Sequence, residues 1–292
     1  MASQLSCLHT HTIFCDGRDD IETMCRAAFE KGLCAIGFSS HAPTAKAGLD
    51  TFWNMKDERM EAYAAEVHAA RQRWEGKIAV YFGLEVDYIK GMRSALDNDI
   101  RHCGADYLIG SIHYLAPAQG APFTIDGSAE ELETGIREGF GGDGEAMIHA
   151  YWDTVMEMIA LGGIDIVGHL DLVKKHNAQG RWFNMESSSY IQRVEEAARA
   201  IAAAGLVLEV NTGGMNRGYL AETCPSPAIL RLLRQYAIPL MISADAHNAN
   251  DLDGHYPQAL QTLLDAGYTS HVIFAGRDNG KPVWTEAAIG VK

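Results

Sequence analysis

Three side chains that can bind a metal ion stand close together near the start of the sequence, in LHTHTIFCDG at residues 8–17. His9 and His11 are two residues apart, so their imidazoles point to the same face of an extended segment and can bind one ion together. Asp16 follows them with a carboxylate. Histidine pairs at this spacing also occur by chance at strand ends, so the rest of the chain has to decide between a metal site and two solvated imidazoles.

Further metal-binding side chains recur at similar places along the chain. Seven short apolar runs are present, and six of them carry such side chains at or near the carboxyl end: His9 and His11, His41, Glu85, His113, His169, and Asp245 with His247. In a β/α barrel the carboxyl ends of the strands meet at one face, where active sites are built. A single buried histidine is more often an ordinary core residue, but the same placement in six runs predicts one shared site.

This set of donors indicates the chemistry to expect. Together with Asp16 it is too large for one tetrahedral zinc ion, which takes about four ligands, so it predicts two or three divalent ions. A mixture of imidazole and carboxylate ligands favours Zn, Fe or Mn. Such clusters polarise phosphoryl oxygens and lower the pKa of bound water. We therefore predict phosphoester hydrolysis, with catalytic roles for Asp16, Glu85, Asp245 and His247.

The elements that must position these residues follow from the apolar pattern. Amphipathic segments at 57–74, 145–162 and 186–205 lie between the apolar runs and are typical of helices. Strands of near-continuous hydrophobicity that alternate with helices indicate a parallel sheet buried on both faces. Seven such units, with a weaker eighth run at 270–276, predict an α/β fold of the closed or nearly closed barrel type, in a single domain over residues 1–292. A doubly wound open sheet is the alternative.

The segment 117–144 interrupts this alternation. It is rich in glycine and acidic residues, and no sequence repeat or low-complexity tract accompanies it. We interpret it as a loop insertion on the side of the barrel that carries the site, rather than as a linker between two domains.

Composition and charge exclude some classes of partner. The formal net charge of −14 at pH 7 argues against nucleic acid, because binding to its phosphates needs clustered lysine and arginine. A small phosphomonoester substrate is compatible with this net charge, because bound divalent ions make the local charge at the site positive. The lack of a signal peptide or a long apolar run predicts a cytoplasmic protein without a membrane partner, and a homo-oligomer is compatible with the sequence. Six cysteines without CxxC spacing are expected to be reduced thiols.

Several polar residues outside the donor set are candidates for substrate binding. Arg217 follows the glycine pair of NTGGMNRGY, which allows close approach of the backbone, and a guanidinium can bind a phosphate with two hydrogen bonds. The alternative is a solvated loop arginine. Arg181 is a second candidate, on the same loop as Lys174 and Lys175, and Asn211 ends the one run that offers no ligand. We expect Asn211 to donate or accept a hydrogen bond with the substrate.

A series of short motifs spans almost the whole chain: HTH with CDG after it, GFSSHAP, GLEVDY, GSIHY, GHLDLVKK, EVNTGG and SADAH. In this order they resemble PHP-domain proteins and, within that superfamily, the histidinol-phosphate phosphatases of the PHP type. The resemblance implies a distorted (β/α)7 TIM-like barrel, in agreement with the seven apolar runs. It also implies hydrolysis of L-histidinol phosphate to L-histidinol and phosphate, a step of histidine biosynthesis.

The same resemblance implies three metal sites that share one carboxylate. Their ligands would be His9, His11, Glu85 and Asp245 for the first, Glu85, His113 and His169 for the second, and Asp16, His41 and His247 for the third. Glu85 would bridge the first two. Three alternatives stay open: a PHP-type phosphoesterase with another small phosphate substrate, a metal-dependent amidohydrolase, and a non-catalytic metal-binding module. No apolar run ends in a lysine that an amidohydrolase could carboxylate.

Overall fold

Seven parallel strands form a barrel that carries the predicted donors at one end. The computed structural model describes residues 4–49 and 51–290. Each strand pairs in parallel with the next one along the chain: β1 (Ser6–Cys7), β2 (Ala35–Phe38), β3 (Ala79–Asp87), β4 (Tyr107–Ser111), β7 (Ile166–Val167), β8 (Val207–Asn211) and β9 (Leu240–Ser243). A parallel bridge between Thr10 and Ala246 joins the last strand to the first. The prediction of a closed or nearly closed barrel is confirmed, and the open-sheet alternative is wrong.

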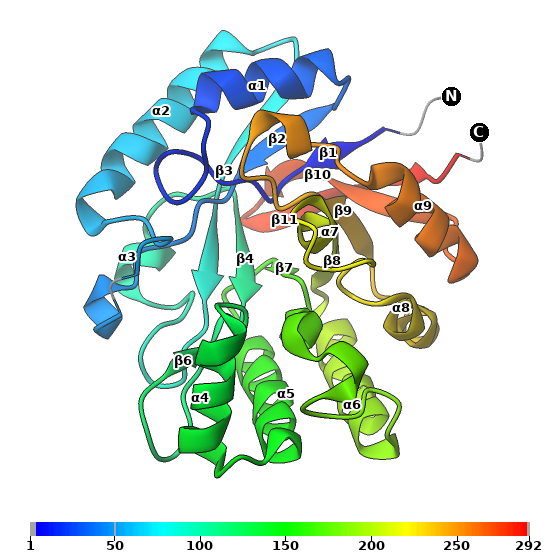
Figure 1. Ribbon diagram of the computed structural model, residues 1–292. Helices are drawn as coiled ribbons and strands as arrows, with labels where there is room; N and C mark the ends of the chain where they lie inside the picture. Colours follow the sequence, from blue (N-terminus) through cyan, green and yellow to red (C-terminus); the bar gives the residue numbers. More distant parts are fainter. Residues whose placement is uncertain (1–3, 50, 291–292) are drawn as a thin grey trace.

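Helices surround the strands, as Figure 1 shows. Their bounds are α1 (Ile21–Glu30), α2 (Met60–Arg73), α3 (Asn98–Arg101), α4 (Ala129–Phe140), α5 (Gly144–Leu161), α6 (Ser188–Ala204), α7 (Gly213–Asn216), α8 (Pro227–Leu233) and α9 (Tyr256–Asp265). Short 3₁₀ turns lie at Ala45–Ala47, Asp57–Arg59, Leu172–His176, Ala178–Gly180, Arg234–Tyr236 and Ala249–Asp251. Within the described ranges, none of the helices is both long enough and apolar enough to cross a membrane.

The three predicted helical segments correspond to α2, α5 and α6, with α5 starting one residue earlier than predicted. The ends of α5 and α6 follow from local capping. The Ser187 side chain accepts a hydrogen bond from the Tyr190 amide at the start of α6, as a good N-cap does. Gly205 ends the same helix with a φ of 65°, a left-handed conformation that glycine adopts without a steric penalty. Asp143 caps α5 in the same way as Ser187 caps α6.

The apolar run at 270–276 does not form an eighth barrel unit. It lies in β10 (Ser270–Asp278), which pairs with β11 (Lys281–Ala288) in a separate antiparallel hairpin. Asn279 and Gly280 connect the two strands with φ values of 49° and 77°, as in the Asn-Gly turns that favour hairpins. This turn reverses the chain, so the run in β10 pairs with β11 and not with a barrel strand. The interpretation of the run as a weak eighth unit is therefore wrong.

The hairpin contributes to an apolar cluster inside the amino-terminal half of the barrel, which we call the floor cluster. Its buried members are Leu8, Tyr107, Ile109, Ile166, Val207, Met241 and Phe274. The Tyr107 ring fits because β2 and β3 place glycines against it. A Cβ atom at Gly37 or Gly83 would lie 2.3 or 2.4 Å from atoms of that side chain. The floor cluster fills the barrel with side chains, as expected for this architecture.

The segment predicted as a loop insertion is largely ordered. It contains α4 and the second strand of a short antiparallel hairpin, β5 (Tyr114–Leu115) and β6 (Phe123–Thr124). The Ser128 side chain caps α4, which explains why this glycine-rich stretch still forms a helix. The amide of Ile125 donates to the carbonyl oxygen of His113 at 2.9 Å. The segment therefore lies beside His113 and contains regular secondary structure.

Candidate metal centre

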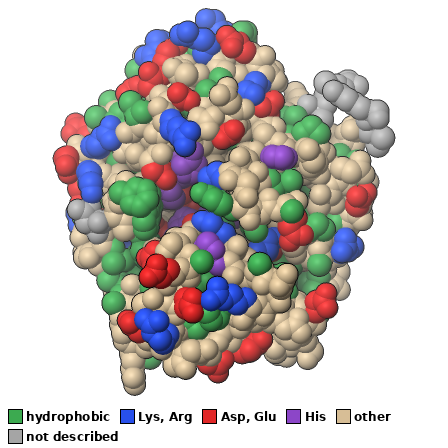
Figure 2. All heavy atoms as spheres, in the orientation of Figure 1, with side chains coloured by type: hydrophobic (Ala, Val, Ile, Leu, Met, Phe, Trp, Pro, Cys, Tyr) green, Lys and Arg blue, Asp and Glu red, His purple; other side chains and the backbone are tan. Residues whose placement is uncertain are grey.

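The structure brings all nine predicted metal donors together at the carboxyl ends of the barrel strands. Figure 2 shows histidine side chains gathered in a hollow of the surface, with basic and acidic side chains around it. Four groups of at least three side chains have donor atoms that all lie within 4.8 Å of one another: His11, Asp16, His41 and His247; His9, His11 and Glu85; His9, His169 and Asp245; and His41, Glu85 and His113. Residues separated by most of the chain thus form one cluster.

Two carboxylates lie close to the imidazoles of His9 and His11. His9 Nε2 lies 3.2 Å from Glu85 Oε2 and 3.7 Å from Asp245 Oδ1. His11 Nε2 lies 3.6 Å and 3.1 Å from the same two oxygens. Zinc bonds of about 2.0–2.1 Å place tetrahedral ligands about 3.4 Å apart. Two of the four distances are close to this value, and the other two lie within about 0.4 Å of it.

The other oxygen of Glu85 faces a second pair of histidines. Glu85 Oε1 lies 2.9 Å from Nε2 of His169 and 3.5 Å from Nε2 of His113. The Ser111 hydroxyl donates to the same oxygen at 2.6 Å, which fixes the orientation of the carboxylate. Each oxygen of this one side chain thus belongs to a different set of donors, an arrangement that suits a bridging ligand.

A third set of donors surrounds Asp16. His247 Nε2 lies 3.2 Å from Asp16 Oδ2, and His41 Nε2 lies 3.9 Å from Asp16 Oδ1. The other nitrogen of His41, Nδ1, lies 2.9 Å from Glu85 Oε2, so this imidazole stands between the first and third sets. Nδ1 of His11 is also 3.7 Å from Asp16 Oδ1. The three sets are therefore contiguous rather than separate sites.

The closure of the barrel places the donors of β1 and β9 side by side. The amide of His11 donates to the carbonyl oxygen of Ala246, and the amide of Ala246 donates to that of His9. Asp245 has a φ of 47°, a left-handed conformation that aspartate tolerates better than most residues. Its side chain packs against Gly213, where a Cβ atom would lie 2.7 Å from the Asp245 carboxylate. The first glycine of the pair that follows β8 thus leaves room for the side chain of a metal donor.

Buried polar atoms in the cluster lack hydrogen-bond partners. Among the described residues, these atoms are His9 Nε2, His11 Nε2, Asp16 Oδ1, His41 Nδ1 and Glu85 Oε2. A buried polar atom without a partner costs about 1–3 kcal/mol, so five in one place would be a large penalty. Divalent cations would satisfy all five atoms at once, and imidazole with carboxylate is a donor mixture that suits Zn, Fe or Mn. The residues present therefore fit a metal centre.

Two buried carboxylates behind the cluster orient its histidines. Glu209 Oε1 lies 2.7 Å from His9 Nδ1, and Asp87 Oδ1 lies 2.7 Å from His113 Nδ1. Such carboxylate–histidine pairs fix the tautomer and the ring orientation of metal ligands. Neither residue was among the predicted site residues. A pattern was available, because Asp87 shares a strand face with Glu85, and Glu209 shares one with the strand-end residue Asn211.

The charges of the cluster shift the pKa values of its members. Burial raises the pKa of Glu85, but the charges of His9 and His41 outweigh it and hold that pKa well below its usual value. Burial lowers the pKa of His113, but the neighbouring Asp87 and Glu85 raise it to about 10. Glu85 therefore favours its charged form, and the surrounding carboxylates favour a positive charge at His113. Metal binding must then release protons.

Arg217 lies at the rim of the cluster. Its Nη2 donates to Asp245 Oδ2 at 2.9 Å, and its Nη1 donates to the Asp245 carbonyl oxygen at 3.2 Å. Nη1 also lies 2.9 Å from His247 Nδ1. The side chain keeps 30% of its surface exposed and lies beside two metal donors. This position suits the predicted phosphate clamp.

The two lysines of the loop after β7 differ in environment. Lys174 is buried and donates to Asp171 Oδ2 at 2.9 Å and to the Thr223 carbonyl oxygen at 2.7 Å. Its ammonium group is therefore bonded to partners inside the protein. Lys175 is half-buried and donates to the Asp126 carbonyl oxygen. Burial lowers the pKa of Lys175, and the positive charge of Arg217 acts in the same direction. Lys175 is therefore the lysine that stands near the rim.

Two predicted substrate-binding residues are engaged elsewhere. Arg181 is half-exposed and forms an ion pair with Glu133 of α4 at 2.8 Å, and over the described residues it contacts none of the clustered donors. The Asn211 amide donates to Glu209 Oε2 at 3.0 Å, and its oxygen accepts from the Gly213 amide at 2.7 Å. Asn211 therefore orients a carboxylate behind the cluster, because both ends of its buried side chain are already bonded inside the protein.

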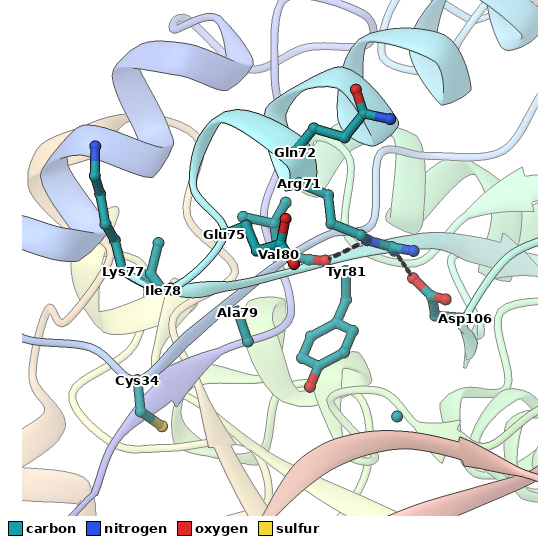
Figure 3. A pocket seen from close by; sticks show the side chains of 12 residues that line it. Cys34, Arg71, Gln72, Glu75, Lys77, Ile78, Ala79, Val80, Tyr81 and Asp106 are labelled. Carbon is teal, nitrogen blue, oxygen red and sulfur yellow. Dashed lines mark hydrogen bonds and ion pairs between the residues drawn. The ribbon is translucent and has the colours of Figure 1, made fainter.

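A cavity of about 730 Å³ lies at the opposite end of β3 from Glu85. Figure 3 shows the Arg71 guanidinium at its edge, bonded to the Val80 carbonyl oxygen and to Asp106. None of the predicted site residues lines this cavity. The arginine is held by its neighbours, so the cavity differs from the metal centre, where buried polar atoms lack partners.

Comparisons with known proteins agree with the geometry. A protein of Deinococcus radiodurans named "Probable histidinol-phosphatase" is 28% identical over 260 residues, which cover 89% of this chain and 92% of that protein. A crystal structure of a candidate histidinol phosphatase from Listeria monocytogenes has a TM-score of 0.75 at 24% identity and covers 87% of this chain and 99% of its own. A histidinol phosphate phosphatase from Lactococcus lactis, crystallised with zinc, L-histidinol and phosphate, has a TM-score of 0.70 at 18% identity, with coverage of 96% and 99%. These two structures establish the fold.

A family model assigns the chain. The PHP domain matches residues 8–213, and this range contains seven of the nine clustered donors; Asp245 and His247 follow it. The motifs that resembled this family therefore lie on one barrel, with their polar side chains in one cluster. Because the match covers more than half of the sequence, the chain belongs to the PHP domain family.

Proposed function

We propose that the protein is a metal-dependent phosphomonoesterase that hydrolyses L-histidinol phosphate to L-histidinol and phosphate. The observation that carries this proposal is the position of Glu85, whose two oxygens face different histidine pairs. A shared carboxylate can hold two cations about 3.5–4 Å apart, the spacing at which paired ions act on phosphate esters. The name of the D. radiodurans relative and the ligands of the L. lactis structure support the choice of substrate.

Metal ions held in the cluster would polarise the phosphoryl group and supply a water-derived nucleophile at neutral pH. The side chains at the rim would orient the substrate. Arg217 can bind two phosphoryl oxygens with its planar guanidinium, and Lys175 adds a second positive charge nearby. These cations attract an anionic substrate to a protein whose formal net charge is −14.

The four proposed catalytic residues act by holding the reacting group in place. Asp16, Glu85 and Asp245 supply the carboxylates of the three donor sets, and His247 supplies an imidazole. Asp245 also fixes Arg217 through two hydrogen bonds, so one residue links the donors to the phosphate clamp. A displaced Asp245 would therefore disturb both metal binding and substrate orientation.

A phosphate-release assay tests the proposal. Purified protein would be supplied in turn with Zn²⁺, Mn²⁺ or Fe²⁺ and offered L-histidinol phosphate and a panel of other small phosphomonoesters. We expect the highest kcat/KM for L-histidinol phosphate. Hydrolysis of other phosphomonoesters without hydrolysis of L-histidinol phosphate would indicate a different phosphoesterase. Metal-loaded protein that hydrolyses none of them would be a non-catalytic metal-binding module.

A further inference from the structure

A row of three aromatic side chains lies beside the metal centre. The ring centres of Phe52 and Trp53 are 5.0 Å apart with planes at 88°, and those of Trp53 and Tyr114 are 6.0 Å apart with planes at 27°. Phe52 is 85% exposed, and Trp53 is half-buried. The row joins the segment after β2 to the hairpin after β4, and none of its members is a metal donor.

The row is attached to the two segments that carry His41 and His113. The amide of Met55 donates to the carbonyl oxygen of His41 at 3.2 Å. Tyr114 directly follows His113, and the imidazole rings of His41 and His113 contact each other with centres 5.3 Å apart. The segments that carry Trp53 and Tyr114 are thus each linked to a metal donor. Figure 2 shows hydrophobic side chains at the border of the hollow that holds the histidines.

The aromatic row and the phosphate clamp occupy different parts of the rim. Arg217 and Lys175 follow β8 and β7, whereas Phe52, Trp53 and Tyr114 follow β2 and β4. A phosphomonoester bound at the metal centre has a phosphoryl group and an alcohol part that need different surroundings. Exposed aromatic rings beside a polar pocket indicate a surface for a flat or apolar group.

We propose that Phe52 and Trp53 bind the ring of the leaving alcohol and thereby select phosphomonoesters whose alcohol carries a flat aromatic or heteroaromatic ring. This inference rests on the proposed function, because it assigns the second half of the same substrate. Aromatic rings attract one another in offset or edge-to-face arrangements, and the perpendicular planes of Phe52 and Trp53 offer both a face and an edge. Neither side chain belongs to the donor groups that would hold the metals.

Substitutions of the two residues, assayed with paired substrates, test this subsite. The variants are Phe52→Leu, Trp53→Leu and Trp53→Phe, and the substrates are L-histidinol phosphate and glycerol phosphate, which lacks a ring. Each leucine variant should lower kcat/KM for L-histidinol phosphate roughly three- to tenfold. The kcat/KM for glycerol phosphate should stay unchanged. Trp53→Phe should retain most of the activity because it keeps a flat ring. Phe29→Leu, a half-exposed aromatic of α1, is the matched control.

Inhibition and binding by the products separate the ring from the phosphate. L-Histidinol should inhibit the leucine variants less strongly than the unmodified protein, while inhibition by inorganic phosphate should stay the same. Calorimetric binding of L-histidinol to metal-loaded protein gives the same comparison without turnover. Melting curves show whether Trp53→Leu stays folded. If it unfolds, Phe52→Leu still tests the proposal, because it removes a solvent-exposed ring that lies outside the core.

The possible failures are distinguishable. Equal losses with both substrates, or unchanged L-histidinol binding in both leucine variants, would overturn the ring subsite and leave the phosphatase proposal intact. If the unmodified metal-loaded protein hydrolysed no phosphomonoester, the proposed function would be wrong. The calorimetric comparison of L-histidinol binding would still decide the role of Phe52 and Trp53.

Discussion

The two ends of the barrel are built by the same strands but have opposite chemistry. In β4, Tyr107 and Ile109 belong to the floor cluster. Two residues further on, Ser111 bonds Glu85, and His113 follows with its ring near the same carboxylate. Alternate residues of a strand share a face, so a single inward-facing row changes from apolar to polar side chains along the strand.

The strands β8 and β9 repeat this change. Val207 and Met241 lie in the floor cluster, whereas Glu209 and Ser243 are bonded to each other further along the two strands. Asp245 continues the row of β9 into the metal centre. The comparison shows a division of roles within one barrel: the floor cluster stabilises the fold, and the other end places charged donors that need cations as partners.

Glu85→Gln should have the largest effect at the polar end. The substitution keeps the size of the side chain but removes the charge that both histidine pairs face, so metal content and activity should fall together. We expect a decrease in kcat/KM of more than about 100-fold, beyond the range typical of residues that only orient a ligand. Elemental analysis and phosphate release measure the two losses. His68→Ala, on α2, should be nearly silent, and equal effects of both substitutions would mean that the site is misplaced.

Phe274→Ala should have its effect at the apolar end. Removing a buried phenylalanine costs about 3–5 kcal/mol, because the cavity left among Tyr107, Ile166 and Val207 closes only partly. The free energy of unfolding should fall by that amount, while the folded protein keeps its metals and its kcat. Denaturant unfolding measures the change, with the more exposed Val283→Ala of β11 as control. Loss of metal without loss of stability would contradict the division between the two ends.

Arg217→Ala should separate substrate binding from metal binding. Loss of a hydrogen bond to a charged group is worth about 1.5–3 kcal/mol, so kcat/KM should fall roughly ten- to 150-fold with a raised KM. Arg217→Lys should recover only part, because an ammonium cannot bind two oxygens in the same plane. Arg217 also bonds Asp245, so metal content has to be measured in parallel. Unchanged kinetics in the alanine variant would leave Lys175 as the candidate clamp.

Glu209→Gln should have the smallest effect of the four. Glu209 does not belong to any of the donor groups. Its Oε2 accepts a hydrogen bond from the His169 amide, and its Oε1 lies close to His9 Nδ1. Substitution of such an orienting carboxylate typically lowers metal affinity about 10- to 100-fold. Titration with a competing chelator measures that affinity, and excess metal should restore most of the activity. Activity that excess metal cannot restore would assign Glu209 a direct role in the reaction.

Sequence patterns predicted the elements whose causes are local. The apolar runs and the capped helix after Ser187 depend on neighbouring residues, and the donors could be grouped because strand ends meet at one face of a barrel. The pairing of β10 with β11 also has a local cause, the turn at Asn279 and Gly280. This turn pattern was not among the features used for the prediction. The role of Glu209 was harder to predict, because its contact with His9 joins residues 200 positions apart.

At the rim, two residues that were predicted to bind substrate have partners inside the protein. Arg181 and Asn211 have the chemistry to bind a substrate, but residue type does not reveal a competing partner. Glu133 of α4 pairs with Arg181, and α4 lies in the segment that was predicted to be a loop. The partner of Arg181 thus lies in a helix that the sequence pattern did not predict.

The central claim is that the buried donors exist to hold catalytic metal ions. The most direct test measures metal content and phosphate release on the same preparation, purified without chelator and then treated with a chelator and dialysed. We predict about two to three equivalents of Zn, Fe or Mn before treatment, loss of activity with the metal, and recovery when the metal is returned. Fewer than one equivalent, with full activity retained after chelation and dialysis, would contradict the account.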